Sequence, residues 1–338
     1  MLEGVTVILV AILGLAVLFD YVNGFHDTAN SIATSVSTRA LRPEQAIVLS
    51  AVANFLGALT GTAVAKTIGA GLIDEKVVNA ADPHQLYVIA ALLGAITWNL
   101  LTWRLGIPSS SSHALIGGLL GATVVASGVG AIKMDGVTGK VLVPLVSSPI
   151  IGLLVGFGFM VVLLNVFRRA HPARLNARFR RLQVLSATYM ALSHGSNDAQ
   201  KTMGVMTLAL FSAGLIPTFE VPLPIILVAA AAMSAGTSVG GWRIIRTMGQ
   251  RVVKLDPIHG FAAETTAATV IFGASHFGMP VSTTHIISSA IMGVGASERL
   301  SAVRWGVAGN IVIAWILTIP AAAAVAAICY AVLNTIVG

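Results

Sequence analysis

Long apolar stretches separated by short polar segments run along almost the whole chain. A helix that crosses a bilayer needs roughly 20 mostly apolar residues, and the sequence offers about ten stretches of this kind. The predicted membrane segments are 5–38, 43–66, 84–105, 108–131, 141–166, 182–213, 222–242, 257–278, 280–297 and 302–335. A soluble core cannot account for so many apolar stretches, so the pattern predicts an all-α polytopic membrane protein in the lipid bilayer.

The composition supports this fold class and limits the function classes. Of the 338 residues, 56% are hydrophobic and 10% are charged, whereas about a quarter of the residues in a soluble domain are charged. The single cysteine, Cys329, excludes a disulfide within the chain. The net charge of +7 would favour nucleic acid only on the surface of a soluble domain. We therefore predict no nucleic-acid partner and no cofactor besides a coupling ion.

Arginines gather near the middle of the chain and set the expected orientation. Short basic loops of membrane proteins face the cytoplasm. Residues 168–181 are therefore expected to form a cytoplasmic linker between a first membrane repeat, 1–167, and a second, 182–338, in the cytoplasmic (inner) membrane. With five segments in each half, both termini are expected outside. The linker cluster comprises Arg168, Arg169, Arg174, Arg178, Arg180 and Arg181.

Two motifs occur once in each half at nearly constant spacing. Gly24-Phe-His-Asp-Thr-Ala-Asn30 resembles Gly195-Ser-Asn-Asp-Ala-Gln-Lys201, which places Asp27 and Asp198 171 positions apart. Pro108-Ser-Ser-Ser-Ser-His113 resembles Pro280-Val-Ser-Thr-Thr-His285 at a spacing of 172. Because each half has an odd number of predicted segments, the second half must be inverted relative to the first, as in many secondary transporters.

The aspartates of the first motif are candidate cation-coupling residues. A carboxylate at membrane depth is costly unless it faces a cavity or a partner, so Asp27 and Asp198 indicate ion or proton handling within broken helices. The amides of Asn30 and Asn197 would add oxygen ligands, and Asp27, Asn30 and Asp198 would hold the metal if the ion is Na⁺. The structural alternative is that each aspartate only caps a half-helix.

Lys201 has two interpretations. It stands where the first half has Asn30, and a buried lysine must pair with a carboxylate or meet an anion. The structural alternative is a simple ion pair with Asp198, three residues earlier on the same helix.

The second motif predicts an anion site. Proline favours the first turn of a helix, so the hydroxyls that follow should lie around helix N-termini, where free N–H groups and the helix dipole attract anions. Two such ends that meet near the midplane would suit a small tetrahedral oxyanion, although caps or helix packing would also explain them. The candidate anion-binding residues are Ser110, Ser111, Ser112, Ser282, Thr283, Thr284 and Lys201.

Four other ionisable residues lie within predicted segments. His113 and His285 end the hydroxyl runs and are as well explained by buried neutral rings as by a proton relay. Glu264 has no acidic counterpart in the first half and is a further candidate for cation coupling, with local pairing as the alternative. Asp20 is a candidate for the wall of the same cavity.

The duplicated motifs resemble those of a known family. The Gly24–Asn30 and Gly195–Lys201 motifs look like the signature, roughly Gly-Ala-Asn-Asp-Val-Ala-Asn, of the inorganic phosphate transporter (PiT) family, in its bacterial low-affinity permease type. The hydroxyl runs and Trp98-Asn-Leu-Leu-Thr-Trp103 are also similar, so the resemblance covers essentially the whole chain. It implies phosphate symport with Na⁺ or H⁺ through inverted repeats with broken helices and hairpins, which would turn about ten segments into 12 helices. It also implies that Asp27, Asn30, Asp198 and the six listed hydroxyls border the substrate and cation sites.

Two departures from the signature concern the same motif. His26 replaces its asparagine in the first copy, and Lys201 replaces its final asparagine in the second. Our hypothesis is that Lys201 substitutes for one bound cation.

Several alternatives stay open at this stage. Some family members carry sulfate, and a metal–phosphate complex is a third candidate substrate. A passive anion channel is disfavoured because buried carboxylates would repel the permeant ion. An intramembrane hydrolase is disfavoured because the sequence has no Gly-x-Ser-x-Gly or His-Glu-x-x-His motif. The oligomeric state is open, with a homodimer among the alternatives.

Overall fold

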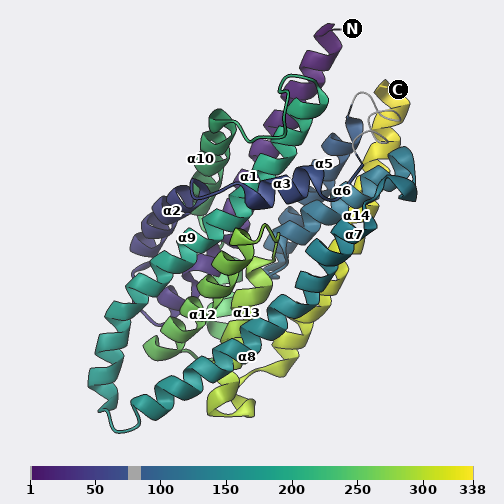
Figure 1. Cartoon of the computed structure of the whole chain (residues 1–338). Coiled ribbons are helices and arrows are strands. Elements are labelled where there is room, and N and C mark those ends of the chain that lie inside the picture. Colours follow the sequence, from purple (N-terminus) through teal and green to yellow (C-terminus); the bar gives the residue numbers. More distant parts are fainter. Residues whose placement is uncertain (1, 75–84, 338) are drawn as a thin grey trace.

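The computed structural model describes residues 2–74 and 85–337, and helices make up most of them (Figure 1). The first half contains α1 (Leu2–Ser37), α2 (Pro43–Ala58), α3 (Ala63–Ala70), α5 (Leu86–Leu105), α6 (Ser111–Ser127), η1 (Val129–Ala131), α7 (Met134–Val137), η2 (Thr138–Leu142) and α8 (Val143–Val166). The second half contains α9 (Pro172–Ser212), α10 (Leu223–Val239), α11 (Trp242–Arg246), η3 (Thr247–Arg251), α12 (Pro257–His276), α13 (Thr283–Glu298), η4 (Leu300–Ala302) and α14 (Trp305–Val337). The prediction of an all-α fold is confirmed for the described residues. Residue 84, where the third predicted segment begins, lies outside them.

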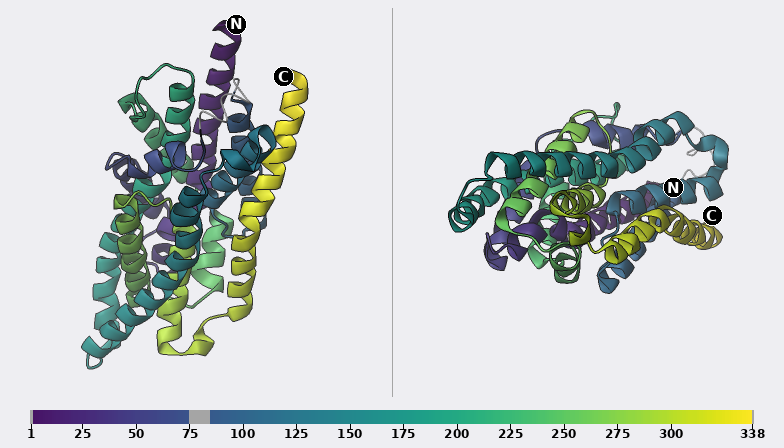
Figure 2. Two further views of the ribbon diagram at one scale, coloured as in Figure 1. Left: turned by 45° about the vertical axis from the view of Figure 1, so that its right-hand side comes forward. Right: turned by 90° about the horizontal axis from the view of Figure 1, so that it is seen from below.

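The order of elements in the first half recurs in the second. Helices α1, α5, α6 and α8 correspond in order to α9, α12, α13 and α14, and the bent pair α2–α3 corresponds to α10 with α11 and η3. Helices α1 and α9 run in opposite directions, as do α8 and α14 (Figure 1). The first turn of α1 and the last turn of α14 lie at one end of the molecule, and the turn between α8 and α9 lies at the other (Figures 1 and 2).

Two equivalent hydrogen bonds show the same correspondence at the level of single residues. The Thr67 hydroxyl donates to the carbonyl of Gly278 at 2.7 Å, and the Thr247 hydroxyl donates to the carbonyl of Gly106 at 2.9 Å. Gly106 and Gly278 both have positive φ and both end a helix of about 20 residues just before a hydroxyl run. In each half, the glycine that precedes the hydroxyl run is thus hydrogen-bonded to the bent helix pair of the other half.

Within residues 2–74 and 85–337, four helical stretches are long and apolar enough to cross a membrane. They are Val7–Ser37, Leu86–Leu105, Met134–Val166 and Trp305–Val337. Two further spans are added if each bent pair counts as one, with bends of 71° between α2 and α3 and 62° between α10 and the helix that follows. The chain is a multi-pass helical protein, and the count of ten segments stays a prediction.

The predicted break of the helix at Asp27 is wrong. Helix α1 continues without interruption from Leu2 to Ser37, and α9 likewise passes through Asp198. Within this stretch, His26, Thr28 and Asn30 find hydrogen-bond partners inside the protein, so the backbone need not open to satisfy them. Gly24, which suggested a break, instead permits close packing, because a Cβ there would lie 2.3 Å from the carbonyl oxygen of Met233.

The central linker is shorter than predicted. Helix α9 begins at Pro172, so residues 172–181 of the predicted 168–181 linker form its first turns. Proline is well suited to the first turn of a helix, and the arginines, leucines and alanines that follow are good helix formers. The basic residues therefore lie mostly on a helix rather than in a loop.

Glycine contacts allow several helix pairs to approach closely, and this gives a stability prediction. At Gly293 of α13, a Cβ would lie 2.1 Å from the carbonyl oxygen of Leu153 in α8. Gly293→Ala should therefore lower the free energy of unfolding by about 1–3 kcal/mol through overpacking, measured as a lower melting temperature in detergent. Gly158→Ala on α8 is the matched control, since a Cβ there meets nothing within 4 Å. An unchanged melting temperature for Gly293→Ala would contradict this packing.

Candidate functional site

The two hydroxyl runs lie at the N-termini of α6 and α13, as predicted. The Ser110 hydroxyl accepts a hydrogen bond from the backbone N–H of His113 at 3.2 Å, and the Ser282 hydroxyl accepts one from the N–H of His285 at 3.2 Å. Ser110 and Ser282 are therefore the caps, which is the structural role considered for them. The next two residues of each run lie in the first helical turn and are buried.

The two helix N-termini meet each other inside the protein. The Ser112 hydroxyl at the start of α6 donates to the carbonyl of Val281, just before α13, at 3.3 Å. The rings of His113 and His285 lie 4.7 Å apart between centroids. Two positive helix ends from different halves therefore converge on one buried region.

Side chains from α1 and α9 complete this region. The Asn30 amide donates to the hydroxyls of Thr283 at 3.2 Å and Thr284 at 2.9 Å. The Thr283 hydroxyl in turn donates to Oδ2 of Asp198 at 3.0 Å. Residues that are far apart in the sequence thus form one continuous polar network.

Lys201 contacts both a candidate anion-binding residue and a candidate cation-coupling residue. It is 1% exposed, and its ammonium contacts Oδ1 of Asp198 and the hydroxyl of Ser112. It also donates to the carbonyl of Val281 at 3.2 Å. The predicted pair with Asp198 is confirmed, and the lysine also reaches the start of α6, where an anion is expected.

Asp27, His194 and Asp198 form a second part of the site. Each offers one ligand atom, and these atoms all lie within 4.8 Å of one another. His26 Nδ1 lies 2.6 Å from Oδ1 of Asp27, and His194 Nε2 lies 3.1 Å from Oδ2 of Asp198. The two carboxylates of the duplicated motif are therefore close together, and the arrangement of oxygen and nitrogen atoms can hold a small cation.

His194 is not among the site residues predicted from the sequence. Its Nδ1 lies 2.9 Å from the amide oxygen of Asn54, which fixes the ring against α2. A signal was available, because His194 precedes Asp198 by four residues and such residues share a helix face.

Two predicted coupling residues lie outside this network. The Asn197 amide donates to the Ser275 hydroxyl at 2.8 Å and to the Met279 carbonyl at 3.3 Å. Glu264 accepts hydrogen bonds from the hydroxyls of Thr34 and Ser186 at 2.5 Å each and from the Gln183 amide at 3.1 Å. Glu264 thus belongs to a separate buried polar cluster of α1, α9 and α12, and the coupling roles of both residues stay predictions.

Two small polar cavities occupy equivalent places in the two halves. One, of about 240 Å³, is lined by the end of α5 and by α11 with η3, including Arg104, Arg243, Arg246 and Arg251. The other, of about 100 Å³, is lined by the end of α12, the bend between α2 and α3, and α9. Each cavity adjoins the glycine turn, at Gly106 or Gly278, that leads into a hydroxyl run.

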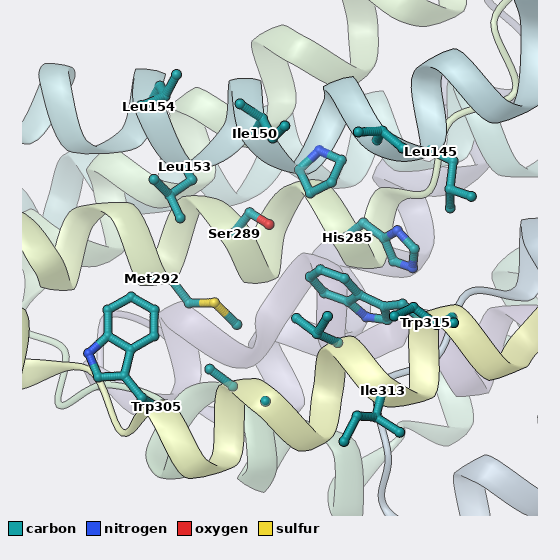
Figure 3. Close-up of a pocket in the computed structure, with 16 residues that line it drawn as sticks. Leu145, Ile150, Leu153, Leu154, His285, Ser289, Met292, Trp305, Ile313 and Trp315 are labelled. Carbon is teal, nitrogen blue, oxygen red and sulfur yellow. The ribbon is translucent and has the colours of Figure 1, made fainter.

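A larger cavity of about 750 Å³ lies between α8, α13 and α14 (Figure 3). Its walls are apolar apart from His285 and Ser289, and the His285 ring stacks on Trp315 with 4.1 Å between centroids. Such a lining offers almost no donors to an oxyanion. This cavity is therefore a poor candidate for an anion site, whereas the converging helix ends carry hydroxyl groups and free N–H groups.

Similarity to known proteins identifies the family of this chain. Residues 23–326 match the sequence pattern of the phosphate transporter family. The chain belongs to that family. It is 47% identical over 330 residues to a "probable low-affinity inorganic phosphate transporter" of Bacillus subtilis. That alignment covers 97% of each of the two chains. It is 49% identical over 325 residues to a protein of the same description from Rhizobium meliloti, with 96% of both chains covered.

A solved structure shares the fold. It is described as "The sodium-dependent phosphate transporter" and matches with a TM-score of 0.87 and 27% identity over 98% of this chain and all of that one. The family and these relatives are transporters, so the hydrolase alternative is excluded and this member of the phosphate transporter family is not an enzyme.

Proposed function

We propose that this chain is a secondary active transporter that carries inorganic phosphate together with a cation, H⁺ or Na⁺, across the cytoplasmic membrane. The observation that carries the proposal is the meeting of two hydroxyl-rich helix N-termini at the buried Asp198–Lys201 pair. An oxyanion and a cation that occupy adjacent places in such a low-dielectric region stabilise each other. Tight binding of either should therefore depend on the other.

The anion would bind at the starts of α6 and α13. The Ser111 hydroxyl has no hydrogen-bond partner among the described residues, and the Ser112 and Thr284 hydroxyls also lie at the converging helix ends. Free N–H groups and the helix dipoles add further attraction for negative charge. Lys201 would supply one fixed positive charge to the bound phosphate.

The cation would bind at the carboxylates of the duplicated motif. Asp27 and Asp198 lie close enough to share one ion, and the Asn30 amide is linked to Asp198 through Thr283. These are the oxygen ligands expected if the ion is Na⁺, and the carboxylates alone suffice for H⁺. Because Lys201 already neutralises Asp198, fewer added cations are needed than two bare carboxylates would require.

Alternating access would follow from two inverted repeats, residues 1–167 and 182–338. The antiparallel course of α1 and α9 and the equivalent cavities beside Gly106 and Gly278 support this division. The arginine-lined cavity would open to the cytoplasm together with the α8–α9 turn, while both termini would face outside. Rocking of one repeat against the other would then expose the site first to one cavity and then to the other.

Uptake of radiolabelled phosphate into proteoliposomes tests the proposal. We expect accumulation above equilibrium under an imposed pH gradient or Na⁺ gradient, with little competition from unlabelled sulfate. The gradient that drives accumulation identifies the coupling ion. Robust sulfate uptake without phosphate uptake would instead indicate a sulfate permease of the same family, and equilibration without accumulation would indicate a passive channel.

A further inference from the structure

One buried carboxylate in the membrane region has no role in the site described above. Asp20 of α1 is 0% exposed, and neither of its carboxylate oxygens has a hydrogen-bond partner among the described residues. It lies two helical turns before Asp27 on the same helix. By contrast, Asp27, Asp198 and Glu264 each have at least one polar partner.

Two polar side chains beside Asp20 carry oxygen atoms that can accept a hydrogen bond and that also lack partners. Asn23 of α1 and Thr202 of α9 are its polar neighbours and are 1% and 0% exposed. The amide oxygen of Asn23 and the hydroxyl of Thr202 have no hydrogen-bond partner in the described part of the chain. A protonated carboxyl group is a donor, whereas a carboxylate is only an acceptor. The Thr202 hydroxyl can donate or accept, whereas the Asn23 amide oxygen can only accept and receives no hydrogen bond from the described residues. One added proton on Asp20 would therefore supply a donor to these acceptor oxygens.

The charges around Asp20 do not compensate a permanent carboxylate there. Asp198 and Lys201 of α9 are the charged groups that act on it, and they are already paired with each other. Helix α10, which packs against α1, has no ionisable residue, and the ionisable residues of α5, Tyr87 and Arg104, lie near its two ends. A bare carboxylate without a partner is costly in such an environment, so Asp20 requires a bound cation.

In the part of the chain that the structure describes, the second half has no equivalent of this group. The position equivalent to Asp20 in the second half is Ala191, a buried residue of α9, and the position equivalent to Asn23 is His194. The duplicated carboxylates Asp27 and Asp198 thus form a shared centre, whereas Asp20 provides a single binding position beside it. A proton fits this position because it needs only one carboxyl group and one acceptor.

We propose that Asp20, with Asn23 and Thr202 as acceptors, is the binding site of a coupling proton, separate from the Asp27–Asp198 centre. This inference rests on the proposed function of phosphate symport. Asp20 takes a proton from the outer water before translocation and releases it to the inner water afterwards, so one proton crosses with each substrate. Asn23 lies on the same helix and Thr202 on the facing one, so relative movement of α1 and α9 changes the acceptors available to that proton.

Asp20→Asn separates coupling from transport, because asparagine is neutral and has nearly the shape of the protonated acid. In proteoliposomes under a pH gradient, the ratio of internal to external phosphate should fall to about one for Asp20→Asn, since a coupling carboxylate is lost. Exchange of external radiolabelled phosphate for internal unlabelled phosphate should persist, because exchange moves no net proton. Asp20→Glu should restore accumulation with a displaced pH profile. Asp135→Asn is the control, because Asp135 is exposed and lies in the short helix α7.

The outcomes distinguish this inference from the proposed function. Wild-type protein that accumulates phosphate under a pH gradient, with an Asp20→Asn variant that only exchanges it, supports both. Unchanged pH-driven accumulation by Asp20→Asn overturns the role of Asp20 and leaves symport intact, as does wild-type accumulation driven by Na⁺ alone. Loss of exchange in Asp20→Asn together with a retained melting temperature also overturns it, because Asp20 would then be needed for phosphate movement itself. Absence of phosphate uptake by the wild type would remove the proposed function.

Discussion

Asp27→Asn and Asp198→Asn should each abolish phosphate accumulation, but only Asp198→Asn should strongly destabilise the protein. Both changes remove a carboxylate from the shared centre, where the ligand atoms of Asp27, His194 and Asp198 lie within 4.8 Å of one another. Removal of the Asp198 charge also leaves the Lys201 ammonium buried without its counter-ion. Breaking a buried ion pair from one side typically costs about 3–5 kcal/mol. Among the described residues, Asp27 forms an ion-pair contact only with the neighbouring His26, so its loss leaves no lysine buried without a counter-ion.

The measurement combines phosphate uptake in proteoliposomes with thermal unfolding in detergent. We expect both variants to lose accumulation and the melting temperature to fall much further for Asp198→Asn. Asp135→Asn, on an exposed position, controls for the loss of one carboxylate. Full uptake by either variant would remove that aspartate from the mechanism, and equal melting temperatures would show that the Asp198–Lys201 pair does not stabilise the fold.

The ends of the helices were largely predictable from the sequence because polar residues and prolines interrupt the apolar stretches. The predicted segment 141–166 ends where α8 ends, and 257–278 matches α12, which spans Pro257–His276. The repeated motifs also predicted that the two hydroxyl runs meet, and Ser112 and Thr283 both join the network around Asp198. These signals are local or arise from the repeat, so they need no knowledge of tertiary packing.

The course of the backbone near Asp27 was not predictable in this way. Polar residues within an apolar stretch are compatible with a broken helix or with an intact helix whose polar face is buried. The intact helix occurs here because Asn30 and His26 find partners on α13 and α5, in Thr284 and Thr102. Those partners lie far away in the sequence, so only the fold decides between the two cases.

The directions in which single side chains point were also not predictable from the sequence. Asn197 and Asp198 are adjacent, but neighbouring residues of a helix point in directions about 100° apart, so adjacency in the sequence does not by itself place both side chains in one site. Asn197 accordingly reaches Ser275 on α12 while Asp198 faces Thr283. Glu264 likewise finds three donors within its own cluster, which its sequence context does not indicate.

Lys201→Asn should make phosphate binding depend on added Na⁺. The substitution restores the residue type that the first half has at Asn30 and removes the fixed charge that neutralises Asp198. Hydrogen bonds to charged groups contribute about 1.5–3 kcal/mol, so phosphate affinity without Na⁺ should fall by a factor of about 10 to 150. Because the freed oxygen ligands can then hold an added cation, Na⁺ should restore part of the affinity.

Binding of radiolabelled phosphate to the purified protein, measured across a series of Na⁺ concentrations, checks this expectation. Lys66→Asn is the matched control, since Lys66 is an exposed lysine of α3. Potassium at the same ionic strength separates specific binding of Na⁺ from screening. If Lys201→Asn binds phosphate as the wild type does, with no response to Na⁺, Lys201 does not stand in for a cation and its contact with Asp198 is structural only. A loss that Na⁺ repairs and potassium does not would establish that the ammonium group occupies the position of an ion.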